Sequence, residues 1–250
     1  MRLVRLLFST VVLLVPAMLN AQTPPDSVME VLRQKARPGM VSDYEANRKK
    51  HMGWHKAQKD PWAWEVFEIM TGPDTGGYVI ASGDHQWKEM EDWVARFADA
   101  DAGDSQATMG PNIASTERTY WTQLNAISRL PKTPDRAPLI TVTRYRVKPG
   151  HEAAFRAAIG KVNAALDAAR FPLATIWFTL ANGGAAPTYA LVAPRNGLGE
   201  MAPAPSLTEI LEKQLGKPAS DALVKSFFDN VTGIETELLR LRIDLSYLPN

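Results

Sequence analysis

The sequence has no cysteine, so disulfide bonds cannot stabilise the fold, and stability must come from burial and hydrogen bonding. It also lacks a charge excess, because 28 Lys and Arg balance 27 Asp and Glu. This balance gives no electrostatic sign of nucleic-acid binding. A G-x-S-x-G elbow, a Walker loop and a His-Glu-x-x-His motif are absent as well, so the sequence gives no support for the hydrolase and phosphoryl-transfer classes that carry them.

Long apolar runs are missing except near the first residue. There, Arg2 and Arg5 precede the apolar residues 6–14, and a small residue, Ala21, offers a cleavage site. An uncleaved membrane anchor is the alternative, but the run is shorter than the roughly 20 apolar residues of a spanning helix. We therefore expect residues 1–21 to be a signal peptide, the protein to be periplasmic or secreted, and no stable membrane insertion after cleavage.

What the chain does contain is an internal repeat. A single shift of 111 positions aligns prolines, glycines and aromatic residues without gaps. The aligned pairs are Pro38 with Pro149, Gly39 with Gly150, Tyr44 with Phe155, Pro61 with Pro172, Phe67 with Phe178, Gly72 with Gly183, Tyr78 with Tyr189, and Met90 with Met201. The chain is predicted to be a tandem duplication.

Each copy is predicted to run strand, helix, strand, strand, helix, strand. In the second copy, β-branched segments, apolar periodicity and turn residues predict these elements at 139–147, 152–169, 173–180, 188–193, 206–228 and 234–245. The second helix begins with a capping box at Ser206 and is interrupted near Gly216. In the first copy the last strand is expected near 117–130, and residues 99–115 are interpreted as a surface excursion because they are poor in large apolar residues.

A βαββαβ unit is a ferredoxin-like sheet with helices on one face. The predicted fold class is therefore α+β, a tandem duplication of ferredoxin-like units whose sheets cover each other as an α/β barrel within one chain. The predicted divisions are the first unit at 22–131, a proline-containing linker at 132–137 and the second unit at 138–250. We expect a monomer with a pseudo-dimeric barrel, with a homodimer as the alternative.

Strand alternation sorts the residues of the second strand of each copy into two faces. Phe67, Ile69, Phe178 and Leu180 form a mostly apolar set, which we expect to pack under the helices. The opposite set mixes aromatic and polar groups, which suits a barrel interior that binds a ligand. It predicts ligand-binding residues, which are Trp62, Trp64, Glu68, Trp177 and Thr179, together with Arg144 as an interior base.

Several segments also resemble a known superfamily. These are Arg144 to Gly150 with its Lys-Pro-Gly ending, Asn182-Gly183-Gly184 before Pro187-Thr188-Tyr189, and Gly83-Asp84-His85-Gln86-Trp87 after a strand. They are similar to an exported bacterial branch of the dimeric α/β-barrel superfamily, near the NIPSNAP, EthD-like and antibiotic-biosynthesis-monooxygenase domains. That resemblance implies the fold over nearly all of the chain after the signal peptide. For function it implies haem-degrading enzymes, cofactor-independent oxygenases, isomerases and binding proteins alike.

Histidines supply two further candidates. His51 and His55 are four residues apart on the first helix, so they share a face and could chelate a metal, but the sequence fixes no third ligand. A polar helix face is the alternative. His85 follows Asp84, a predicted N-cap, and could be a general base or a haem ligand, or simply a first-turn residue.

Glu68 is the other candidate for catalysis. A carboxylate desolvated in the barrel could act as an acid or a base, whereas a salt bridge or exposure at the strand end is the alternative. The leading hypothesis is a barrel that binds a small molecule. A cofactor-independent or haem-dependent oxygenase that uses Glu68 or His85 is the alternative enzyme, and a structural or interaction protein with a packed interior is the third hypothesis.

Overall fold

The structure is a computed structural model that describes residues 25–131, 136–202 and 205–249. The predicted signal peptide at 1–21 and positions 132–135 of the predicted linker lie outside these ranges. In the first unit the elements are β1 (Val28–Ala36), α1 (Val41–Gln58), β2 (Glu65–Ile69), β3 (Tyr78–His85), α2 (Trp87–Thr108) and β4 (Ile113–Gln123). In the second unit they are β5 (Leu139–Val147), α3 (Glu152–Ala168), β6 (Ile176–Asn182), β7 (Thr188–Arg195), α4 (Leu207–Leu215), α5 (Lys217–Asp229) and β8 (Val231–Leu241).

The eight strands close into one antiparallel barrel in the order β1-β3-β2-β8-β5-β7-β6-β4. Exchanging each strand for its repeat equivalent leaves this order unchanged, so the two units are related by a pseudo-twofold axis along the barrel. The last strand of each unit closes onto the other unit, β4 against β6 and β8 against β2. This confirms the predicted tandem ferredoxin-like fold, with the two sheets facing each other within one chain.

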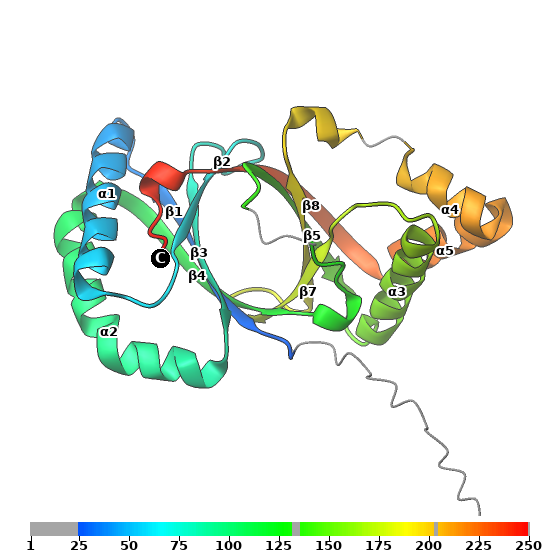
Figure 1. Ribbon diagram of the computed structural model, residues 1–250, viewed down its shortest axis with the longest axis horizontal. Helices are drawn as coiled ribbons and strands as arrows, with labels where there is room; N and C mark the ends of the chain where they lie inside the picture. Colours follow the sequence, from blue (N-terminus) through cyan, green and yellow to red (C-terminus); the bar gives the residue numbers. More distant parts are fainter. Residues whose placement is uncertain (1–24, 132–135, 203–204, 250) are drawn as a thin grey trace, which may run out of the picture.

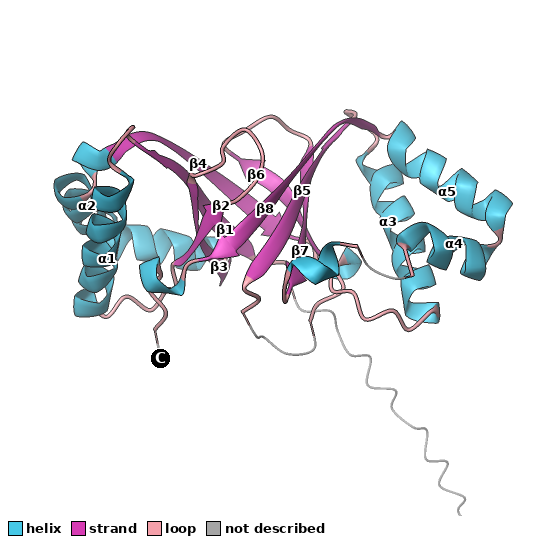
Figure 2. Ribbon diagram, turned by 90° about the horizontal axis from the view of Figure 1, so that it is seen from above, coloured by secondary structure: helices cyan, strands magenta, loops and turns pink. Residues whose placement is uncertain are grey.

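The helices cover the barrel on two opposite sides. Figure 1 shows α1 and α2 outside the strands of the first unit, and α3, α4 and α5 outside those of the second. Seen from above in Figure 2, the barrel lies between these two helical layers. Among the described residues, no helix combines the length and the apolar character needed to cross a membrane.

The predicted assignment of strand faces is wrong, because the two faces are exchanged. Phe67 and Ile69 point into the barrel, where they pack with Val79 and Leu239, and Phe178 packs there with Trp121. The side chains predicted to line the barrel lie on its outer face instead. Trp62 and Trp64 pack under α1 and α2, Trp177 packs against Phe155 of α3, and Glu68 and Thr179 share the outer face of their strands.

The physical reason is that both faces of the barrel wall are buried. An alternation of two residues fixes which side chains share a face, but it does not say which face meets the helices. Under α1 and α2 the indole N–H groups of Trp64 and Trp93 each donate to buried Asp60, so aromatic and polar groups are satisfied there without a ligand. The barrel interior is lined mainly by aliphatic and Phe side chains.

Two predictions around α2 are also wrong. The helix continues from Trp87 to Thr108, so most of the expected surface excursion at 99–115 is helical. It begins after Gln86, which forms a capping box with Glu89, whereas Asp84, the predicted N-cap, lies in β3 with a φ of 63°. The predicted capping box at Ser206 is present, and α4 and α5 are separated at Gly216 as expected.

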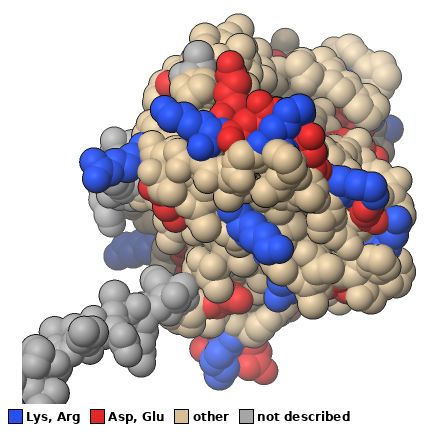
Figure 3. Space-filling model, turned by 90° about the vertical axis from the view of Figure 1, so that its right-hand side faces the viewer, with Lys and Arg blue, Asp and Glu red and all other residues tan. Residues whose placement is uncertain are grey.

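The surface agrees with the balanced composition. Figure 3 shows the side covered by the helices of the second unit, where Lys and Arg are interspersed with Asp and Glu. On α5, Lys217 lies 3.0 Å from Asp221, and Lys225 forms a similar pair with Asp229 at 2.5 Å. Charges on this face therefore neutralise one another locally.

Candidate functional site

The interior of the barrel contains a cavity of about 740 Å³. This volume lies within the usual range for pockets that bind small molecules. Its middle is apolar, because the inward-facing side chains of β2, β3, β5, β6 and β8 meet there with those of β1 and β4. These side chains are Val31, Phe67, Val79, Trp121, Ile140, Val142, Ile176, Phe178, Leu239 and Leu241.

One end of the cavity carries a charged cluster. Arg33 of β1 donates two hydrogen bonds to Glu237 of β8, at 2.8 and 3.0 Å, and a third to Asp74 at 3.0 Å. Arg144 of β5 donates from Nη1 to the same Glu237 at 2.7 Å. Glu237 is therefore a single carboxylate held by two guanidinium groups, and only 4% of its side chain is exposed.

The electrostatics keep this cluster charged. Burial raises the pKa of the Glu237 carboxyl, but hydrogen bonds from Arg33 and Arg144 outweigh it, so the net direction is downward. Among described residues, Glu237 is the one hydrogen-bond partner of Arg144, and the bond comes from Nη1. A quarter of the Arg144 side chain is exposed. Its Nη2 can therefore donate to a molecule in the cavity.

The repeat explains part of this arrangement. Arg33 and Arg144 are separated by 111 positions, so they are equivalent residues brought together by the pseudo-twofold axis. Glu237 has no acidic equivalent in the first unit. When β4 and β8 are aligned from their first residues, Ile113 and Val231, the residue of β4 that corresponds to Glu237 is Thr119. The cavity is therefore asymmetric, with a carboxylate on one side and a hydroxyl on the other.

Acidification should weaken the protein through Glu237. Its pKa in the folded state is lowered from the ordinary 4.5, so its contribution to stability is fully present above that value and is lost as the pH falls through the folded-state pKa. We expect the melting temperature of the wild type to fall more steeply below about pH 4.5 than that of Glu237→Gln, which cannot titrate there. Equal slopes in melting curves recorded between pH 7 and pH 3 would contradict this.

The structure brings only one of the predicted ligand-binding residues into the cavity. Arg144 lines it, as expected of an interior base. Glu68 lies outside, where it accepts hydrogen bonds from Arg240 at 2.6 Å and Arg242 at 3.3 Å. This is the salt-bridge alternative for Glu68.

His85 is also outside the cavity. Its ring stacks on Trp62 with 3.7 Å between the ring centroids, and its Nε2 lies 2.8 Å from the hydroxyl of Ser82. Burial lowers the pKa of His85, which favours the neutral ring. Because one face and Nε2 are both engaged, His85 does not fit the role of a haem ligand in this arrangement.

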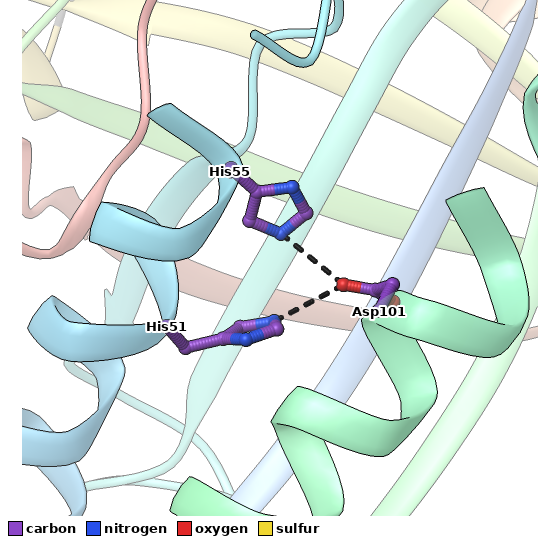
Figure 4. Close-up of side chains that lie close together, drawn as sticks. All are labelled: His51, His55 and Asp101. Atoms are coloured by element: carbon purple, nitrogen blue, oxygen red, sulfur yellow. Dashed lines mark ion pairs between the residues drawn. The ribbon is translucent and has the colours of Figure 1, made fainter. Parts of the chain in front are cut away.

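The two histidines of α1 lie together in the layer between the helices and the barrel. Figure 4 shows His51 and His55 pointing toward Asp101 of α2, with both Nε2 atoms 3.3 Å from its Oδ1. Sequence reasoning missed Asp101, because the residues around it were interpreted as a surface excursion. It also missed Arg33 and Glu237, although the repeat shift from Arg144 would have identified Arg33.

Comparisons with protein-family models and with the curated proteins give no match. Solved structures of similar fold exist. A protein of Fusobacterium nucleatum subsp. nucleatum assigned as a monooxygenase is 10% identical, with a TM-score of 0.56 over 86% of this chain and 92% of that chain. One from Lactobacillus acidophilus NCFM, also assigned as a monooxygenase, is 9% identical, with a TM-score of 0.53 over 90% and 98%. A chlorite dismutase variant from Candidatus Nitrospira defluvii is 9% identical, with a TM-score of 0.54 over 88% and 92%.

At these identities the likeness concerns the fold. The chain has the dimeric α/β-barrel fold that the resemblance implies, and both halves of that fold lie on one chain.

Proposed function

We propose that this protein binds one small molecule inside its barrel, with an apolar body in the middle of the cavity and an anionic or strongly polar group at Arg144. The observation that carries this proposal is the apolar cavity inside the barrel, which ends in a guanidinium group with an uncommitted donor. A cavity of about 740 Å³ has room for a molecule of two or three fused rings. Because residues 1–21 are predicted to be a signal peptide, we propose that this binding takes place in the periplasm or outside the cell.

Binding ranks above turnover because of where the predicted catalytic residues lie. An oxygenase is the alternative that the resemblance implies, and proteins assigned as monooxygenases share the fold. However, Glu68 and His85, the acid or base predicted for such a reaction, do not line the cavity. The third hypothesis, a packed interior, disagrees with the volume of the cavity.

Two dyes with the same aromatic body can test the proposal. N-phenyl-1-naphthylamine is neutral, and 8-anilinonaphthalene-1-sulfonate adds an anionic group. We expect the protein to bind one molecule of either dye, with micromolar affinity. Arg144→Met should weaken binding of the sulfonate at least about tenfold and that of the neutral dye little, because one charge-assisted hydrogen bond contributes roughly 1.5 kcal/mol or more.

Filling the cavity provides the complementary measurement. Ala81 of β3 lines the cavity and is partly buried, so Ala81→Leu should reduce the affinity for both dyes at least about tenfold by occupying their space. The matched control is Ala114→Leu, at an exposed position of β4 that does not line the cavity. Dye binding that is insensitive to Ala81→Leu, or equally sensitive to both variants, would place the dye elsewhere and refute the proposal.

A further inference from the structure

The layer between α1, α2 and the barrel contains three converging side chains that the proposed function does not use. They are His51 and His55 of α1 and Asp101 of α2, and their nearest ligand atoms all lie within 4.8 Å of one another (Figure 4). Both imidazoles are almost completely buried, with 4% and 2% of the side chain exposed. This cluster lies on the outer face of the barrel wall, so it is separate from the cavity.

Each histidine is oriented by a second carboxylate. His51 Nδ1 lies 2.7 Å from Asp104 Oδ2, and His55 Nδ1 lies 2.8 Å from Asp60 Oδ2. Asp60 also accepts hydrogen bonds from the indole groups of Trp64 and Trp93, both at 3.0 Å. When each carboxylate accepts a hydrogen bond from the Nδ1–H group of its histidine, the Nε2 lone pair is left free. Carboxylates placed in this way orient metal-binding histidines in many proteins.

The atoms that face one another are therefore all acceptors. Asp101 Oδ1 is buried, and no described residue donates a hydrogen bond to it. The two Nε2 atoms each lie 3.3 Å from this oxygen. Buried acceptors that converge without a donor are costly, and a cation bound between them would satisfy all three.

The spacing suits a metal ion. Ligand atoms about 2.0–2.1 Å from a tetrahedral ion lie about 3.3–3.4 Å from each other, which matches both nitrogen-to-oxygen distances. Two imidazoles and one carboxylate form a donor set that binds zinc and other first-row transition ions. Three protein ligands leave a coordination position for water, and Asp101, with 20% of its side chain exposed, connects the cluster to solvent.

In the second unit, the residues equivalent to His51 and His55 are apolar and serve only in packing. The repeat equivalents of His51 and His55 are Val162 and Leu166 of α3. Val162 packs in an apolar cluster between α3, α4 and α5, and Leu166 is buried. The fold thus closes with aliphatic side chains at these positions, so packing alone does not account for the histidines and their acids.

We propose that His51 Nε2, His55 Nε2 and Asp101 Oδ1 bind one divalent first-row transition ion, with Asp104 and Asp60 holding the two imidazoles in the binding orientation. A structural cluster in which the imidazoles are protonated and pair with Asp101 is the competing explanation. The two explanations predict opposite effects for the same substitution.

The first experiment is a titration of the purified, chelator-treated protein with Zn²⁺ and with Co²⁺. We expect one ion per chain and, for Co²⁺, the visible absorption of a low-symmetry site with nitrogen and oxygen ligands. Asp101→Asn should weaken Zn²⁺ binding about 100-fold, and Asp104→Asn about 10-fold or more. The matched control is Asp92→Asn, at an exposed position of the same helix, which should bind Zn²⁺ as the wild type does.

Thermal unfolding separates the two explanations, because they predict opposite changes in the melting temperature of metal-free Asp101→Asn. At Zn²⁺ 100-fold above its dissociation constant, the wild type should melt roughly 5 to 10 °C higher, and Asp101→Asn should show no such shift. Without metal, Asp101→Asn should melt at or above the wild type, because the amide can donate to an Nε2 atom. A lower melting temperature for metal-free Asp101→Asn, or Zn²⁺ binding equal in Asp101→Asn and Asp92→Asn, would overturn the proposal.

Discussion

Replacing Glu237 with alanine is expected to lower the free energy of unfolding by about 3–5 kcal/mol. The substitution removes the carboxylate that holds Arg33 and Arg144 and leaves two guanidinium groups facing each other across the end of the cavity. Breaking a buried ion pair by removing one partner costs this much because the remaining charge stays desolvated without its partner. Arg144 loses the carboxylate to which it donates, and Arg33 keeps its hydrogen bond to Asp74. Chemical denaturation with a wild-type reference measures the change.

The neighbouring acid on the same strand provides the control. Glu235 is 71% exposed and lies 3.8 Å from Arg144, so Glu235→Ala should change the stability by no more than about 0.5 kcal/mol. Replacing all three charges, as Arg33→Met with Glu237→Leu and Arg144→Met, should recover most of the loss, because apolar groups can fill the same space. A loss for Glu237→Ala as small as that for Glu235→Ala would show that the cluster is hydrated and not buried.

The architecture could be predicted because the signal for it is distributed along the chain. Landmarks as unlike as Gly72, Tyr78 and Phe67 recur at one shift, and the order of elements in one copy then fixes the order in the other. Closure of the barrel followed from a sheet that has helices on one face only. Local turn chemistry was equally informative at Ser206, where the capping box forms as predicted.

The faces could not be predicted, because strand alternation does not say which face of the barrel wall the helices cover. Trp62 and Trp64 looked suited to a ligand-binding interior, but Asp60, two and four residues before them, accepts hydrogen bonds from both on the helix side. Once that carboxylate is buried under α1 and α2, the tryptophans must follow it. Phe67 then faces the barrel interior. The residues of β2 predicted to bind a ligand therefore lie on the outer face, as Trp64 does.

The histidine cluster could also be predicted only in part from the sequence. His51 and His55 could be identified from their spacing, but their third partner comes from the C-terminal part of α2, which was predicted to be a surface excursion. Residues 99–108 contain Ala, Gly, Ser and Asp and no large apolar side chain, so the helical period of α2 is invisible there. In this segment Asp101 and Asp104 lie against the histidines of α1, so the contact between the two helices is polar there.

Adding one methyl group at Gly183 is expected to cost roughly 3–5 kcal/mol, the second large effect. Gly183 follows β6 and adopts a φ of +93°, and a Cβ there would lie 2.4 Å from the carbonyl oxygen of Arg118 in β4. The contact is with backbone, so it cannot be relieved by rotating a side chain. Strands β4 and β6 form one of the two seams where the repeats join, and Gly183→Ala should weaken the closure of the barrel.

Two other glycines separate the steric contribution from the conformational one. Gly72, the repeat equivalent of Gly183, has a φ of +94° but no atom closer than 3.9 Å to the position of a Cβ, so Gly72→Ala should cost only the left-handed strain of about 1–2 kcal/mol. Gly160 lies within α3 with nothing near, so Gly160→Ala should raise stability by about 0.5–1 kcal/mol. Unfolding free energies should rank Gly160→Ala, wild type, Gly72→Ala and Gly183→Ala from highest to lowest. If Gly183→Ala is no less stable than Gly72→Ala, the close approach of β4 is not what requires glycine at this seam.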